Sequence, residues 1–79
     1  MFKTDEELYR TISNNIKQFR QTAGLTQQEL ADKATISISY LTKIEAESCN
    51  KSLSISTLNQ IANALNIEIT EFLKEEYNG

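Results

Sequence analysis

The amino-acid sequence predicts an all-α fold, and three observations carry this prediction. Proline is absent and only two glycines occur in the 79 residues, so little interrupts a helix. Apolar residues recur every three or four positions, which is the spacing of one helix face. The helix-start pattern Ser/Thr-x-x-Glu occurs at residues 4–7 and 26–29. The alternating runs at 36–39 and 53–56 are too short to favour strands.

The first helix is predicted over about residues 5–22. Thr4 is its expected N-cap, because Glu7 completes the capping box. Gly24 can adopt the left-handed conformation that commonly ends a helix. The inward stripe consists of Leu8, Ile12, Ile16 and Phe19.

Two short helices are predicted next, over about 27–33 and 38–46. Thr26 begins the first, and Ser37 is a suitable N-cap for the second. Leu41 and Ile44 are expected to point inward. The polar, irregular segment 47–53 indicates a loop.

The last two helices are predicted over about 55–65 and 69–76. Ser54 is the expected N-cap of the first, and Asn66 tolerates the left-handed conformation that can end it. The inward residues of the first are expected to be Ile55, Leu58, Ile61, Ala62 and Leu65. The last helix carries Ile69, Phe72 and Leu73, and Phe72 and Leu73 could belong either to the core or to a dimer contact.

Length and composition restrict the function classes. A chain of 79 residues corresponds to one small domain, residues 1–79, with a thin core. One cysteine excludes an intramolecular disulfide and a cysteine-based metal cluster, and the absence of histidine removes the commonest general base. We therefore expect no enzyme, catalytic residue, metal or cofactor. No segment has the length of a membrane span or the apolar stretch of a signal peptide, so a cytoplasmic location is expected.

Charge is distributed unevenly along the chain. The net charge is −3, and the isoelectric point is near 4.8. Residues 10–51 nevertheless hold six basic and four acidic residues, a net charge of +2, between two acidic ends. An acidic protein is unsuited to sequence-blind nucleic-acid binding, but this pattern allows a local basic face.

The two short helices form a helix-turn-helix candidate over about residues 27–46. Helices that cross closely need a small residue at the crossing, and Ala31 provides one. A DNA major groove about 12 Å wide admits such a second helix, with its N-terminal side chains nearest the base edges. The residues left outward on this helix are Ile38, Ser39, Tyr40, Thr42 and Lys43.

Three stretches carry a resemblance to a known family. They are Asn-Ile-Lys-Gln-Phe-Arg over 15–20, Gly-Leu-Thr-Gln-Gln-Glu-Leu-Ala over 24–31 and Ile-Ser-Ile-Ser-Tyr-Leu-Thr-Lys-Ile-Glu over 36–45. Together they resemble the Cro/CI-type (XRE family) helix-turn-helix transcriptional regulators, and residues 54–72 resemble the family's fourth and fifth helices. The resemblance implies a five-helix, lambda-repressor-like domain with an extended first helix. It also implies a repressor that binds a two-fold symmetric double-stranded DNA operator as a homodimer.

The resemblance also implies roles for individual residues. The base-reading positions are matched by Ile38, Ser39, Thr42 and Lys43. The phosphate-contacting positions are matched by Lys17, Gln27, Tyr40 and Lys51. Arg20 and Glu45 match a buried, structural ion pair. Lysine can donate to guanine, and an isoleucine can pack on a thymine methyl group.

The sequence departs from the family pattern at three places. Thr35 stands where relatives usually have glycine, and a β-branched residue at positive φ is strained. Residues 46–48, Ala-Glu-Ser, replace the basic residues and glycine that often follow the second helix. The loop before Ser54 is about two residues longer than usual.

These departures keep a second function open. The same fold can serve as a protein-interaction module, either antitoxin-like or a co-regulator subunit, and the acidic ends and residues 46–48 favour that alternative. Such a module would enrich no operator from random DNA. An enzyme is disfavoured, because neither histidine nor a paired-carboxylate motif is present.

Overall fold

The structure, a computed structural model, describes residues 4–46 and 53–75. Within these ranges it contains helices and no strand, so the all-α prediction is confirmed there. The elements are α1 (Asp5–Thr22), α2 (Gln27–Ala34), α3 (Ile38–Glu45), α4 (Ile55–Ala64) and the 3-10 helix η2 (Ile69–Leu73). The bounds of the four α-helices differ from the predicted ones by at most one residue.

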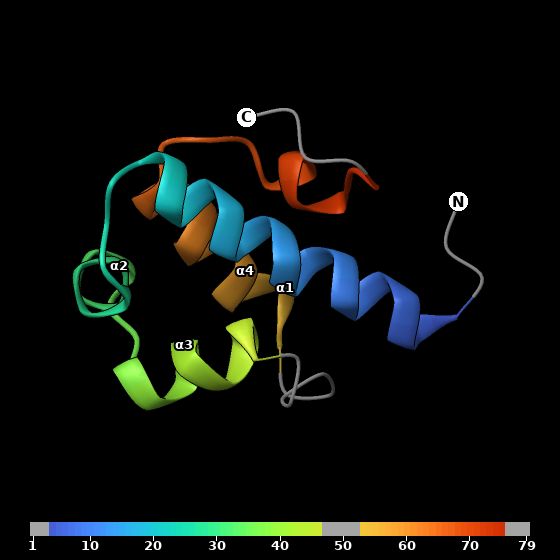
Figure 1. Cartoon of the computed structure of the whole chain (residues 1–79), viewed down its shortest axis with the longest axis horizontal. Coiled ribbons are helices and arrows are strands. Elements are labelled where there is room, and N and C mark those ends of the chain that lie inside the picture. The colour runs from blue at the N-terminus through green and yellow to red at the C-terminus, as the bar shows by residue number, and fades with distance from the viewer. Residues whose placement is uncertain (1–3, 47–52, 76–79) are drawn as a thin grey trace.

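Helix α1 crosses the molecule diagonally in Figure 1. Helices α2 and α3 lie toward its C-terminal end, and η2 lies on the side of α1 opposite α3. Helix α4 contacts both α2 and η2, and it passes behind α1 in this view. The helix-turn-helix unit therefore packs against α1 through α3 and against α4 through α2.

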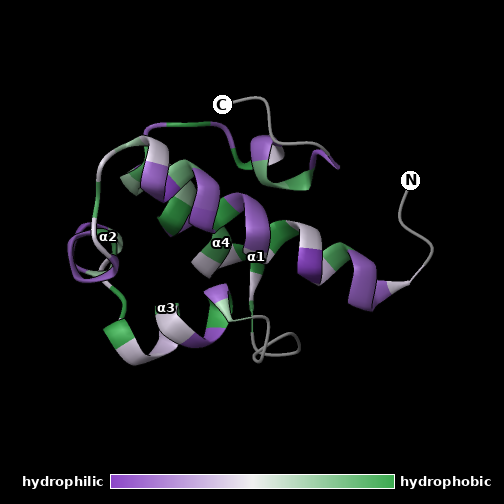
Figure 2. Ribbon diagram, viewed as in Figure 1, coloured by the Kyte–Doolittle hydropathy of each residue, from purple (hydrophilic) through white to green (hydrophobic). Residues whose placement is uncertain are grey.

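The core lies between these helices. Hydrophilic and hydrophobic residues alternate in bands along α1, as an amphipathic helix requires (Figure 2). The aromatic rings of Phe19 and Phe72 meet edge to face, with centroids 6.0 Å apart. The buried apolar residues are Ile12, Ile16, Leu30, Ala31, Ala34, Leu41, Ile44, Leu58, Ile61, Ala62 and Phe72.

Three helices end with the same hydrogen-bonding device. In each, a residue in the left-handed conformation follows the helix, and the next amide donates to a carbonyl five positions earlier at 3.0 or 3.1 Å. The left-handed residues are Gly24 (φ 74°), Thr35 (φ 59°) and Asn66 (φ 57°). The predicted roles of Gly24 and Asn66 are confirmed.

The prediction of a fifth α-helix over 69–76 is wrong for the described residues, which form only the five-residue 3-10 helix η2. Asn15 on α1, a buried residue that is 2% exposed, contacts the end of this segment. Its Nδ2 donates to the carbonyls of Phe72 at 2.9 Å and Lys74 at 2.8 Å. These two bonds hold the chain that leaves η2, which is extended at Lys74, against α1.

The expectation that Ile55 points into the core is also wrong, and Leu73, for which a dimer contact was the alternative to the core, is exposed. Ile55 is 80% exposed and Leu73 is 40% exposed. Ile55 lies one turn before the buried Leu58 on the same face of α4, but no described element covers it. Sequence periodicity shows which residues share a helix face. Whether the first residue of that face is buried depends on how far the neighbouring elements extend.

Candidate nucleic-acid interface

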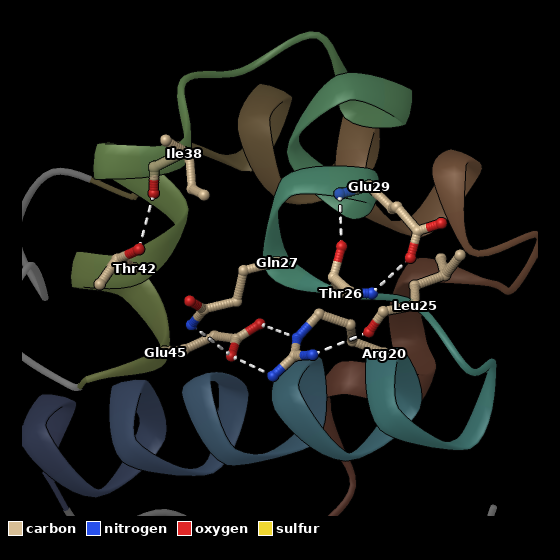
Figure 3. A network of polar contacts seen from close by, with 8 residues as sticks. All are labelled: Arg20, Leu25, Thr26, Gln27, Glu29, Ile38, Thr42 and Glu45. Carbon is tan, nitrogen blue, oxygen red and sulfur yellow. Dashed lines mark hydrogen bonds and ion pairs between the residues drawn. The ribbon is translucent and has the colours of Figure 1, made fainter.

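The start of α2 is held by a reciprocal capping box. The Glu29 amide donates to Thr26 Oγ1 at 3.1 Å, and the Thr26 amide donates to Glu29 Oε1 at 2.8 Å (Figure 3). The bond from the Thr26 backbone, together with that from its side chain, lowers the pKa of Glu29. The carboxylate therefore stays ionised at neutral pH. Its negative charge also interacts favourably with the positive end of the α2 dipole.

The turn between α2 and α3 keeps a left-handed residue without glycine. Thr35 adopts φ 59° and ψ 43°, and the Ile36 amide donates to the Ala31 carbonyl at 3.0 Å. From α4, Gln60 Nε2 donates to the Ala34 carbonyl at 3.2 Å. Sequence reasoning missed Gln60, because no local pattern links it to a helix end 26 residues away.

Replacing Thr35 with glycine should stabilise the fold. The left-handed conformation strains a β-branched residue, and its relief should exceed the added chain entropy by about 1 kcal/mol. For a domain of this size that corresponds to a rise in melting temperature of about 4–8 °C. Lys33→Gly, at an exposed position inside α2, is the control and should lower the stability by about 1 kcal/mol. Equal destabilisation by both changes would contradict the assigned strain.

One flank of α3 projects into solvent. Ser37 caps the helix by accepting the Tyr40 amide at 3.1 Å. Leu41, Ile44 and Glu45 are buried, which fixes the orientation of the helix. The exposed residues are Ser37, Ile38, Ser39, Thr42 and Lys43, and Tyr40 is half-buried. The four residues expected to read bases thus share an exposed surface, and Ile38 is 39% exposed there.

An ion pair under this flank joins three helices. Arg20 Nε and Nη2 donate to the two carboxylate oxygens of Glu45 at 2.8 and 3.0 Å (Figure 3). The two side chains are only 11% and 3% exposed. Arg20 Nη1 also donates to the Leu25 carbonyl at 2.8 Å, and Gln27 Nε2 donates to Glu45 Oε1 at 3.1 Å. The network fixes the end of α3 against α1 and the start of α2.

The residues expected to contact phosphate have different surroundings. Gln27 is half-buried, and its side-chain amide is directed to Glu45 rather than into solvent (Figure 3). Lys17 is exposed on α1, one turn before Arg20. Lys51 lies outside the described residues. Because Arg20 pairs with Glu45, α3 presents Lys43 and no exposed acidic side chain.

Residues 4–46 and 53–75 contain no cluster of three or more Cys, Asp or Glu side chains that could hold a metal ion. Among the same residues, no helix has the length and hydropathy to cross a membrane.

The sequence of this chain is similar to those of known helix-turn-helix proteins. Residues 16–72 match the model of the helix-turn-helix family HTH_3. The chain is 44% identical over 66 residues to the immunity repressor protein of Bacillus phage phi105, covering 84% of this chain and 44% of that protein. It is 35% identical over 72 residues to the HTH-type transcriptional regulator SinR of Bacillus licheniformis, covering 86% of this chain and 64% of that one. The chain thus spans less than two thirds of either relative.

The fold is also similar to that of a protein of known structure. The restriction-modification controller protein C.AhdI from Aeromonas hydrophila superimposes with a TM-score of 0.75 at 25% identity, covering 81% of this chain and 94% of that one.

Proposed function

Because the chain belongs to the helix-turn-helix family HTH_3, we propose that it is a sequence-specific DNA-binding transcriptional repressor. The observation that carries the proposal is the exposed flank of α3, whose opposite side is anchored by Leu41, Ile44 and the Arg20–Glu45 pair. The names of the relatives, an immunity repressor and a transcriptional regulator, support the same function. Such a protein works beside the chromosome, so we also propose a cytoplasmic location.

In the proposed complex, the N-terminal half of α3 enters the major groove. Lys43 donates to guanine O6 or N7, and Ile38 packs on a thymine methyl group. Ser39 contacts an adjacent base edge. Lys17, Gln27, Tyr40 and Lys51 face the phosphates, with Gln27 placed by its bond to Glu45. Occupying an operator in this way would exclude RNA polymerase from it.

We further propose that the repressor is a homodimer that binds a two-fold symmetric operator. Ile55 and Leu73, both exposed, border a groove of about 440 Å³ between α1, α4 and η2. An exposed apolar residue beside an apolar groove is self-complementary, as a two-fold interface requires, so we assign the groove to a second copy of the chain. The groove walls include Leu8, Ile12, Leu53, Leu58 and Ile69. No described residue of α3 lines it, so both α3 flanks would stay available for half-sites about 34 Å apart.

Selection of bound duplexes from a random pool tests the proposed function. We expect enrichment of one sequence with two related half-sites about 10 base pairs apart. Failure to enrich any sequence, combined with specific recovery of a protein partner, would replace the repressor by the protein-interaction module.

Replacing Lys43 with alanine should alter which base is preferred. Loss of its donors should weaken binding to the selected operator by about 1–3 kcal/mol and relax the preference at one position in each half-site. Lys33→Ala on α2 removes a comparable exposed charge from outside α3 and should leave base preference unchanged. Repeating the duplex selection with both variants measures the effect. An unaltered sequence preference for Lys43→Ala would show that another side chain reads that base.

A further inference from the structure

The hydroxyl of Thr42 has a fixed partner within α3. Its Oγ1 donates to the Ile38 carbonyl at 2.8 Å, one turn back along the helix (Figure 3). A hydroxyl has one hydrogen and two acceptor lone pairs. Because the hydrogen is directed along the helix, the oxygen presents only acceptor character to a ligand approaching this exposed face.

The next residue has the opposite character. Lys43 carries three donors and no acceptor. Two adjacent positions of the exposed flank therefore differ in hydrogen-bond polarity, although a threonine hydroxyl is in general able to act in either sense. The polarity of Thr42 could be reversed only by breaking its bond to the Ile38 carbonyl.

From this bond we infer that Thr42 is a specificity-determining acceptor that recognises the exocyclic amino group of adenine or cytosine. In the major groove, adenine N6 and cytosine N4 are the donors, whereas guanine and thymine present only acceptors at their polar groups. The inference rests on the proposed function, because it concerns a base in the operator. On the strand that Thr42 faces, each half-site should hold adenine or cytosine at one position and exclude guanine and thymine.

The test combines a side-chain change with a base change. Thr42→Val keeps the β-branched shape and removes the oxygen, and Thr42→Ser keeps the hydroxyl. The Ile38 carbonyl retains its helical backbone bond in both variants, and residue 42 is exposed, so the fold should be preserved. Thermal unfolding checks this. The duplex is the operator selected with the unchanged protein. It is compared with a copy lacking the amino group at that position, with purine in place of adenine or 2-pyrimidinone in place of cytosine.

Removing the amino group should weaken binding of the unchanged protein and of Thr42→Ser by about fivefold, the effect of one hydrogen bond. Thr42→Val should bind the original operator about fivefold more weakly and be insensitive to the missing amino group. A Thr42→Val variant as sensitive as the unchanged protein at every adenine and cytosine would overturn the inference while leaving the proposed function intact. If no operator is selected, both the proposed function and this inference are overturned.

Discussion

Replacing Arg20 with methionine is expected to lower the free energy of unfolding by about 3–5 kcal/mol, because Glu45 would remain buried without its partner. The Glu45 side chain is 3% exposed, so solvent cannot take over the role of the guanidinium. Domains of this length typically have about 4–12 kcal/mol of stability, so the variant should melt far below the unchanged protein. Chemical denaturation followed by circular dichroism measures the loss.

The chain contains a matched control for this prediction. Arg10 pairs with Glu6 at 3.2 Å, but the two side chains are 58% and 73% exposed. Arg10→Met should therefore change the stability by at most about 1 kcal/mol. The double change Arg20→Met with Glu45→Leu removes both charges and should recover much of the loss. If Arg20→Met and Arg10→Met had equal effects, the Arg20–Glu45 pair would not hold α3 in place.

Replacing Ile55 with aspartate should weaken operator binding by about 100-fold or more, because the two half-sites would no longer be bound by one linked dimer. Ile55 is 80% exposed in the single chain, so the change leaves the core untouched. In a dimer, the same carboxylate would be buried in the partner's apolar groove, where an unpaired charge is strongly unfavourable. Sedimentation velocity should show a monomer, and operator titration should show the loss of affinity.

Asn59→Asp provides the control for charge alone. Asn59 is exposed on the same helix, one turn beyond Ile55, and does not line this groove. The variant should keep the dimer and bind the operator with nearly unchanged affinity. A dimer that survived Ile55→Asp would remove the groove between α1, α4 and η2 from the interface.

Local signals predicted most of the fold. Side-chain caps at Thr4, Thr26, Ser37 and Ser54 accept amides three residues later, and these contacts are short-range consequences of residue type. The left-handed conformations of Gly24 and Asn66 follow from the same local rules, whereas that of the β-branched Thr35 does not. Helix positions and most of the core could therefore be predicted from sequence spacing alone.

What could not be predicted depends on residues distant in sequence. Asn15 binds the end of η2 and the residue after it through carbonyls 57 and 59 residues away, and no local pattern predicts such a contact. The exposure of Ile55 likewise depends on which element covers the start of α4. At the candidate site, the exposed flank was predicted from helix periodicity. The hydrogen bond from Thr42 to the Ile38 carbonyl could not be predicted from the sequence, because a threonine in a helix can orient its hydroxyl in more than one way.

The placement of the α3 flank against DNA is tested most directly by amide chemical shifts. A nitrogen-15-labelled protein would be titrated with its selected operator and, separately, with a scrambled duplex of equal length. With the operator, we predict the largest changes at residues 37–43 and at the start of α2, beyond those that the scrambled duplex produces. Unchanged amides in α3, with perturbations confined to the groove between α1, α4 and η2, would contradict this placement.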